Sequence, residues 1–156
     1  MLLALLLLYP LLAAAVALAF RRRAVSAAVV AVSSLLLPLG TFAAAWRGGR
    51  FTEFLAVDEL NRVFLALLAV VFAASGVASV RLLRREPAEG KAHAYYAAAL
   101  VLFVASMTGA LLSTNLALLW VFLEASTLAS AVLVYHHRTR ASLEATWKYL
   151  FICSLG

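Results

Sequence analysis

The sequence predicts an all-α fold, a polytopic transmembrane helix bundle with five full spans and the start of a sixth. Hydrophobic residues make up 66% of the 156 residues and charged residues only 13%. Soluble domains are roughly 25% charged, because their surfaces must face water. Apolar runs of about twenty residues, the length that crosses a bilayer, recur along the chain. Lipid is therefore the solvent in which this chain folds.

The spans are set by apolar runs that end at charged or helix-breaking residues. The five full spans are expected at residues 1–20, 24–46, 63–83, 94–112 and 116–135. Three arginines at 21–23 stop the first run, and a proline and a glycine predict a loop at 86–93. A sixth helix starts around Ser142, but the sequence stops at Gly156, before a crossing is complete. We therefore expect either a fragment of a longer protein or an incomplete sixth helix.

The basic residues behind the formal charge of +6 stand in short clusters between apolar runs, at 21–23, 81–91 and 136–140. This pattern is typical of topology determinants and lipid-headgroup contacts, so the expected partner is the bilayer and not a nucleic acid. The clusters follow spans one, three and five, whereas the bases after span two are offset by acids. The positive-inside rule then places the N-terminus outside the cell's inner membrane.

The sequence shows no motif for a cofactor, a metal or a catalytic residue. It has no glycine-rich phosphate loop, no paired-cysteine site and no nucleophile–base arrangement. Cys153, the one cysteine, has no partner for an internal disulfide, and we expect a small core residue. His93, His136 and His137 lie at span ends beside bases, where contact with lipid headgroups is expected. The predicted site therefore has no cofactor, no metal and no catalytic residue.

Glu124 interrupts the interior of the fifth span, about 12 Å along it at about 1.5 Å per residue. An ionised carboxylate at that depth costs about 2.5 to 3.5 kcal/mol on insertion scales, so such a group is usually paired or exchanges protons with a water-filled path. The alternative is a neutral, structural carboxylic acid that is hydrogen-bonded to a neighbouring helix. Thr127 and Ser130 add hydroxyls that could hold waters or serve helix packing, and their spacing does not decide between the two.

Lys148 lies about two turns into the sixth helix, deeper than an ordinary interfacial lysine. A lysine removed from water gives up its proton more readily and can then relay protons. The alternative is an interfacial ion pair with Glu144, four residues earlier, in the favourable order of acid before base. The residues alone favour the ion pair slightly.

Two motifs in the last third of the chain resemble a known family. They read N-L-x-x-x-W-x-x-x-E-A-[ST]-T-L-[AS]-S at 115–130 and S-L-E-A-x-W-K-Y-[IL] at 142–150. Upstream, residues 57–80 begin with a V-D-x-L motif. This pattern resembles the N-terminal part of the antiporter-like, proton-translocating membrane subunits of complex I and group 4 membrane-bound hydrogenases, hydrogenase-4 component F above all.

The resemblance implies a fold of about fourteen helices containing inverted repeats. Residues 1–93 would form three leading helices, and residues 94–156 the start of the first antiporter-like repeat. It also implies that Glu124 and Lys148 belong to the proton path, and that the partners are other membrane subunits and peripheral electron-transfer subunits. The implied role is a non-redox, proton-translocating subunit of a hydrogenase-4 or NADH-quinone oxidoreductase complex. Two alternatives stay open: a subunit of an Mrp-type sodium/proton antiporter, and a non-transporting membrane scaffold.

Overall fold

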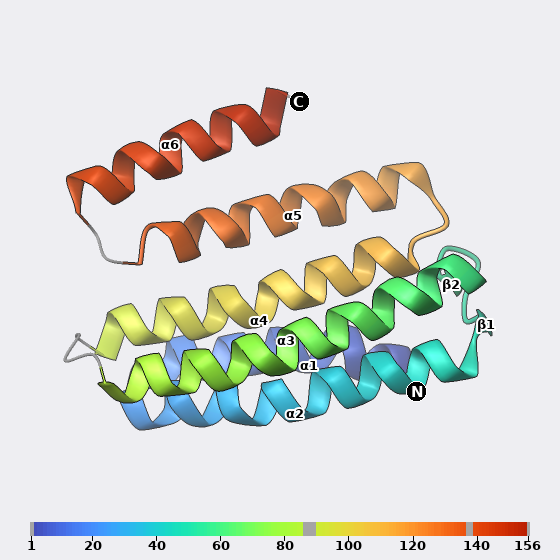
Figure 1. Cartoon of the computed structure of the whole chain (residues 1–156), viewed down its shortest axis with the longest axis horizontal. Coiled ribbons are helices and arrows are strands. Elements are labelled where there is room, and N and C mark those ends of the chain that lie inside the picture. Colours follow the sequence, from blue (N-terminus) through green and yellow to red (C-terminus); the bar gives the residue numbers. More distant parts are fainter. Residues whose placement is uncertain (1, 86–89, 137–138, 156) are drawn as a thin grey trace.

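The computed structural model describes residues 2–85, 90–136 and 139–155, and these form six helices and one small hairpin (Figure 1). The helices are α1 (Leu2–Phe20), α2 (Arg23–Arg47), α3 (Glu59–Arg85), α4 (Gly90–Leu112), α5 (Leu116–Val134) and α6 (Arg140–Leu155). Between α2 and α3, strands β1 (Gly49–Arg50) and β2 (Ala56–Val57) pair antiparallel. Helices α2 to α5 are each long and apolar enough to cross a membrane. The predicted helical membrane bundle is confirmed.

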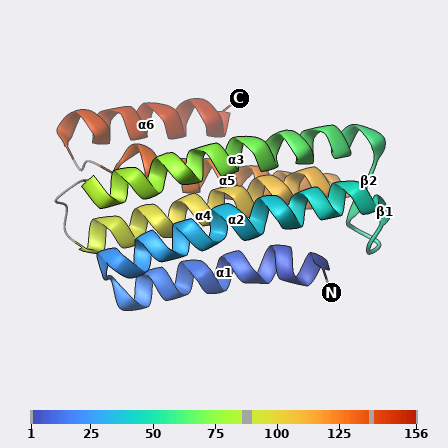
Figure 2. The ribbon, with the colours of Figure 1, turned by 60° about the horizontal axis from the view of Figure 1, so that its bottom comes forward.

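The helices run side by side along the long axis of the molecule, with α4 in the middle (Figures 1 and 2). Helix α4 packs against α1, α2, α3 and α5, whereas α6 lies at the outer edge and packs against α5. The starts of α2 and α4 and the ends of α3 and α5 share one end of the bundle, which we call the arginine-rich end. The β-hairpin and the α4–α5 turn share the opposite end, the hairpin end.

Small residues let α2 and α3 approach closely. A Cβ atom added to Gly76 on α3 would collide with the Cβ atom of Ser34 on α2. Lipid is as apolar as a leucine side chain, so close packing and hydrogen bonds must drive helix association instead of apolar burial. The structure supplies both, because the Tyr9 hydroxyl lies 3.1 Å from Ser33 Oγ, and Ser79 Oγ lies 2.9 Å from the Tyr96 hydroxyl.

The arginine-rich end is tied together through backbone carbonyls. Arg23 Nε donates to the Leu83 carbonyl at 2.7 Å, and its Nη2 donates to the Arg84 carbonyl. The guanidinium thus caps the last carbonyls of α3, where a positive charge is favourable. A Cβ atom at Gly90 would collide with the Arg21 carbonyl, so glycine permits the close approach of α4 to the α1–α2 turn.

The hairpin end is closed by the segment between α2 and α3. The Thr114 amide donates to the Phe54 carbonyl at 2.9 Å, and Leu55 forms an isolated bridge with Ser113. Gly48, at φ 58°, allows the Arg62 guanidinium to lie against the backbone there. The segment therefore holds the α4–α5 turn from which α5 begins.

Three helices begin earlier than their hydropathy predicts. Helix α3 starts at Glu59 instead of near residue 63, α4 starts at Gly90 within the predicted loop 86–93, and α6 starts at Arg140 instead of Ser142. The length of an apolar run reflects the thickness of the hydrocarbon layer of the bilayer. A helix, however, continues into the headgroup region as long as its backbone stays hydrogen-bonded. The predicted ends of the first, fourth and fifth spans agree with the structure to within one residue.

Candidate functional site

Glu124 lies near the middle of α5, whose start is fixed by an N-cap. Asn115 Oδ1 accepts hydrogen bonds from the amides of Ala117 at 2.9 Å and Leu118 at 3.4 Å. These are backbone donors that the first turn of a helix leaves unsatisfied. The cap and the hairpin contacts at Thr114 together set where α5 begins, and hence the depth of Glu124.

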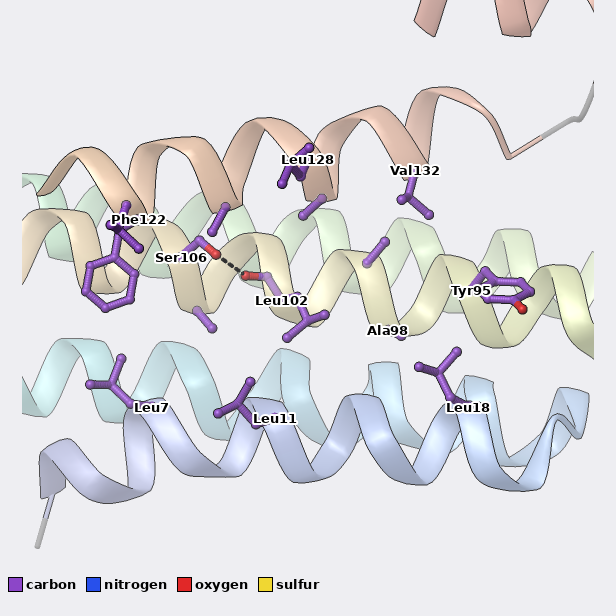
Figure 3. A pocket seen from close by; sticks show the side chains of 15 residues that line it. Leu7, Leu11, Leu18, Tyr95, Ala98, Leu102, Ser106, Phe122, Leu128 and Val132 are labelled. Atoms are coloured by element: carbon purple, nitrogen blue, oxygen red, sulfur yellow. Dashed lines mark hydrogen bonds between the residues drawn. The ribbon is translucent and has the colours of Figure 1, made fainter. Parts of the chain in front are cut away.

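The face of α5 that carries Glu124 is turned away from α4. Phe122 points from α5 toward α4, and its ring occupies the space that a side chain at Gly109 would need (Figure 3). Ser126 and Ala129, one and two turns from Phe122, are buried on that same side. Glu124 instead shares a face with Ala131, two turns further on, which is buried and lines a groove beside α6. Glu124 therefore lies on the α6 side of α5.

The Glu124 side chain is partly buried, and its polar surroundings are sparse. Within the described ranges 2–85, 90–136 and 139–155, no hydrogen bond or ion pair involves its carboxylate. Thr127 Oγ1 donates to the backbone carbonyl of Glu124 at 2.8 Å, and Ser130 Oγ donates to that of Ser126 at 2.7 Å. The hydroxyls predicted to support Glu124 thus bond to their own helix, but each oxygen still has lone pairs with which to accept from water.

Lys148 is paired with Glu144 on α6. Its Nζ lies 2.6 Å from Glu144 Oε1, and the two side chains are 70% and 68% exposed. This is the spacing of an acid followed by a base one turn later. Among the described residues no ion pair joins Lys148 to Glu124, so the structure places the two predicted proton-path residues on neighbouring helices without a direct bond.

Two of the grooves that border α5 in the described part of the chain lie between it and neighbouring helices. The first, of about 640 Å³, lies between α1, α4 and α5, and we call it the apolar groove (Figure 3). Its lining is almost entirely hydrocarbon: Leu7, Leu11, Leu18, Tyr95, Ala98, Ala99, Leu102, Ala105, Ser106, Val121, Phe122, Ala125, Leu128, Ala129 and Val132. The second, of about 570 Å³, lies between α4, α5 and α6, and we call it the polar groove. It is lined by Ala92, Tyr95, Tyr96, Leu128, Ala131, Val132, Tyr135, His136, Leu143, Thr146 and Leu150.

The prediction of headgroup contact is wrong for His93. The side chain is fully buried in the first turn of α4, because that helix begins at Gly90 and carries the histidine into the bundle. His136 is partly buried, and its ring centroid lies 4.8 Å from that of Tyr96. His137 lies outside the described residues. Cys153 is partly exposed in the structure and is not the core residue that was predicted. Among the described residues, no group of three histidine, cysteine or acidic side chains could hold a metal ion.

Helix length, apolar composition and side-by-side packing define the chain as a multi-pass helical membrane protein. In a match 112 residues long that covers 67% of the chain, it is 35% identical to the hydrogenase-4 component F homolog of Methylacidiphilum infernorum (isolate V4). The match confirms the predicted resemblance, and it relates the chain to the antiporter-like membrane subunits of the group 4 hydrogenases. The chain spans 23% of that relative's length. No protein-family model and no solved structure matches the chain.

Proposed function

We propose that this chain is part of a proton-translocating membrane subunit of a hydrogenase-4-type oxidoreductase complex. Protons pass through Glu and Lys side chains of the membrane helices, with the partly buried Glu124 as the central group and Lys148 as a relay on α6. The subunit itself carries no redox cofactor. Electron transfer belongs to peripheral partners, and neighbouring membrane subunits complete the assembly.

The position of Glu124 carries the proposal. Of the seven acidic residues in the sequence, it is the one in the interior of an apolar span. The described helices give its carboxylate no partner, and the insertion cost of about 2.5 to 3.5 kcal/mol is not offset by a salt bridge among them. A carboxylate that exchanges its proton with water avoids a permanent charge at this depth. The relation to hydrogenase-4 component F supports the same role.

Lys148 is a proposed relay because its helix lies beside the helix of Glu124. Helix α6 packs against α5, the helix that bears Glu124. An ammonium group paired with Glu144 at 2.6 Å can exchange its partner, because both side chains are largely exposed here. Thr127, Ser130 and Glu144 are the proposed supporting polar residues, since their oxygens can accept hydrogen bonds from water.

The test of the proposal is the substitution Glu124→Gln in the intact complex. The amide keeps the size and hydrogen bonding of the side chain but loses the exchangeable proton, so assembly persists while proton translocation falls sharply. Glu124→Asp does less harm, because it keeps the acid with a shorter reach. The measurement is formation of a pH gradient in inverted vesicles at matched levels of complex. Full pumping by the glutamine variant contradicts a role of Glu124 in the proton path.

The proposed orientation has a test of its own. The N-terminus is placed outside, and the arginine-rich end faces the cytoplasm, as the positive-inside rule requires. A single cysteine introduced at Lys91 reacts with a membrane-impermeant thiol reagent in inverted vesicles but not in intact cells, and one at Thr52 shows the opposite pattern. Both chains carry Cys153→Ser to remove the native thiol. Labelling of the Lys91 position in intact cells reverses the proposed topology.

A further inference from the structure

Helices α2 and α3 pack side by side, and a groove of about 570 Å³ lies between them at the arginine-rich end (Figure 1). We call it the α2–α3 groove. Four alanines that share one face of α2 supply most of its lining, and two arginines supply its charged groups. The lining residues are Arg23, Ala24, Ala27, Ala28, Ala31, Leu83 and Arg84. The groove therefore combines an apolar trough with a basic mouth.

The length of the groove matches part of one leaflet of a bilayer. From Arg23 to Ala31 it follows about two turns of α2, or about 12 Å at about 1.5 Å per residue. The hydrocarbon core of a bilayer is about 30 Å thick, so each leaflet contributes about 15 Å. Arg23 is the first residue of α2, a helix long and apolar enough to cross a membrane. The mouth thus lies at the level of the headgroups, and the alanines lie at the level of the acyl chains.

The two arginines at the mouth keep donors for a further ligand. Arg23 Nε donates to the Leu83 carbonyl at 2.7 Å, and Arg23 Nη2 donates to the Arg84 carbonyl. A guanidinium has five N–H groups, so three remain on Arg23. The Arg84 side chain is exposed and makes no hydrogen bond or ion pair with the described residues. Guanidinium groups bind phosphate oxygens with paired hydrogen bonds, so the mouth can hold a phosphate.

The charge around the mouth favours an anion. Four further arginines lie within three residues of Arg23 or Arg84 in the sequence, namely Arg21, Arg22, Arg81 and Arg85. Among the described residues the acids lie elsewhere, at the hairpin end, on α5 and on α6: Glu53, Asp58, Glu59, Glu124 and Glu144. Glu86 and Glu89 lie outside the described residues. Basic pockets between membrane helices bind anionic headgroups, whereas a zwitterionic headgroup brings a cation that arginines repel.

We propose that the α2–α3 groove binds one anionic phospholipid, with its phosphate on Arg23 and Arg84 and an acyl chain along the alanines of α2. The phosphate then bridges the start of α2 and the end of α3, two segments that lie sixty residues apart in the sequence. The inference is independent of the proposed proton path, and it stands whether or not Glu124 carries protons.

Photo-crosslinking in vesicles tests the proposal. The full-length protein, in its complex, is reconstituted in phosphatidylcholine vesicles with a small fraction of a lipid that carries a diazirine in its acyl chain. The probe is either phosphatidylglycerol or phosphatidylcholine, and mass spectrometry of peptides maps the attached lipid. Each arginine near an anionic lipid strengthens its binding about fivefold, so the phosphatidylglycerol probe attaches to residues 24–31 at about five times the yield of the phosphatidylcholine probe or more.

Two results with the unaltered protein overturn the proposal. Equal attachment of the two probes to residues 24–31 shows that the groove holds bulk lipid without selection by charge. Attachment of neither probe there, with labelling elsewhere on the protein, shows that a protein segment covers the groove.

Charge variants locate the headgroup. Arg84→Gln removes one guanidinium and lowers attachment of the phosphatidylglycerol probe to residues 24–31 about fivefold, whereas Arg84→Lys retains most of it. Arg140→Gln removes the same charge at the same end of the bundle, on α6, and is the matched control with unchanged attachment. Equal losses in Arg84→Gln and Arg140→Gln overturn the site, because the overall charge of the surface then explains the binding.

A size variant locates the acyl chain. Ala28→Trp fills the trough and removes attachment of the probe to residues 24–31, compared at matched levels of assembled complex. Ala78→Trp is the matched control, since it replaces an exposed alanine at a similar distance from the arginine-rich end, on α3 and outside the groove lining. Unchanged attachment in Ala28→Trp contradicts the proposal. If that variant does not assemble, Arg84→Gln decides, because the Arg84 side chain has no bond to the described residues that its loss would break.

Discussion

Helices α4 and α5 are neighbours with equally apolar spans, yet they stand in opposite environments. Within the structure, 67% of the apolar window of α4 is buried, against 17% of that of α5. The difference lies in residue size, because α4 places alanines at positions 97–99 and 105 and a glycine at 109, where other helices come close. In lipid, burial inside a protein follows small residues and not hydropathy. Helix α4 is thus the structural centre, whereas most of α5 lies at the surface of the described bundle.

Hydroxyl groups show the same division. Two hydroxyl pairs in α1 to α4 join one helix to another, namely Tyr9–Ser33 and Ser79–Tyr96. Other hydroxyls of α2 and α4 bond back to their own helix, as Thr41 and Thr108 do. On α5 they bond back to their own helix, as Thr127 does to the Glu124 carbonyl. Among the described residues, the hydroxyl pairs that join helices therefore lie in α1 to α4, and the hydroxyls of α5 leave the region around Glu124 open to water or to a further helix.

The largest expected effect is on the packed region. Gly76→Leu places a side chain where Ser34 already lies, so α2 and α3 cannot pack and the protein fails to accumulate. Ala78→Leu, two residues away on the exposed side of α3, is the matched control and accumulates normally. The measurement is the amount of assembled complex in isolated membranes. Normal assembly of the Gly76→Leu variant removes the distinction between a tightly packed centre and an open α5–α6 pair.

A smaller effect is expected on the open α5–α6 pair, in function and not in assembly. Lys148→Met removes the ammonium that the proposal uses as a relay, so proton translocation falls severalfold at normal complex levels. Glu144→Gln removes only its exposed partner and leaves pumping nearly intact, because an exposed ion pair contributes about 1 kcal/mol or less. Equal, mild losses in the two variants favour an interfacial ion pair and no relay.

The hydropathy of the sequence was enough to predict the helix bundle. One acidic residue inside an apolar run was enough to single out Glu124. An acid inside an apolar run stands out without any tertiary information, and the apolar spans follow from the thickness of the bilayer, although the starts of α3, α4 and α6 do not. The polar groove could not be predicted, because Tyr95 and Tyr135 are forty residues apart in the sequence and line one groove only through the packing of α4 on α5. The prediction that His93 contacts lipid headgroups was wrong for the same reason, since the burial of this side chain depends on where α4 begins.

The hairpin between α2 and α3 also escaped prediction. Each strand has two residues, too few to show the alternation of polar and apolar residues that predicts a strand. The connection between the strands contacts the distant Ser113 and Thr114, which meet Leu55 and Phe54 only when α4 is in place. Long-range contacts of this kind hold the loops, whereas the spans are fixed by local composition.

The smallest expected effect concerns the hydrogen bonds that join the leading helices. Tyr9→Phe removes the hydroxyl that lies 3.1 Å from Ser33 Oγ and keeps the ring, so the loss of stability is small. Interhelical hydrogen bonds in membrane proteins contribute about 0.6 kcal/mol on average and at most about 1.7 kcal/mol, because the unfolded chain in lipid also finds partners. A double-mutant cycle with Ser33→Ala, followed by denaturant titration of the purified protein in detergent, isolates the coupling between the two groups. The cycle gives a favourable coupling in that range, whereas Thr127→Val on α5 shows none with either residue. A coupling near zero between Tyr9 and Ser33 means that close packing alone holds α1 to α2, and the contrast between hydroxyls that join helices and hydroxyls that do not then fails at its first example.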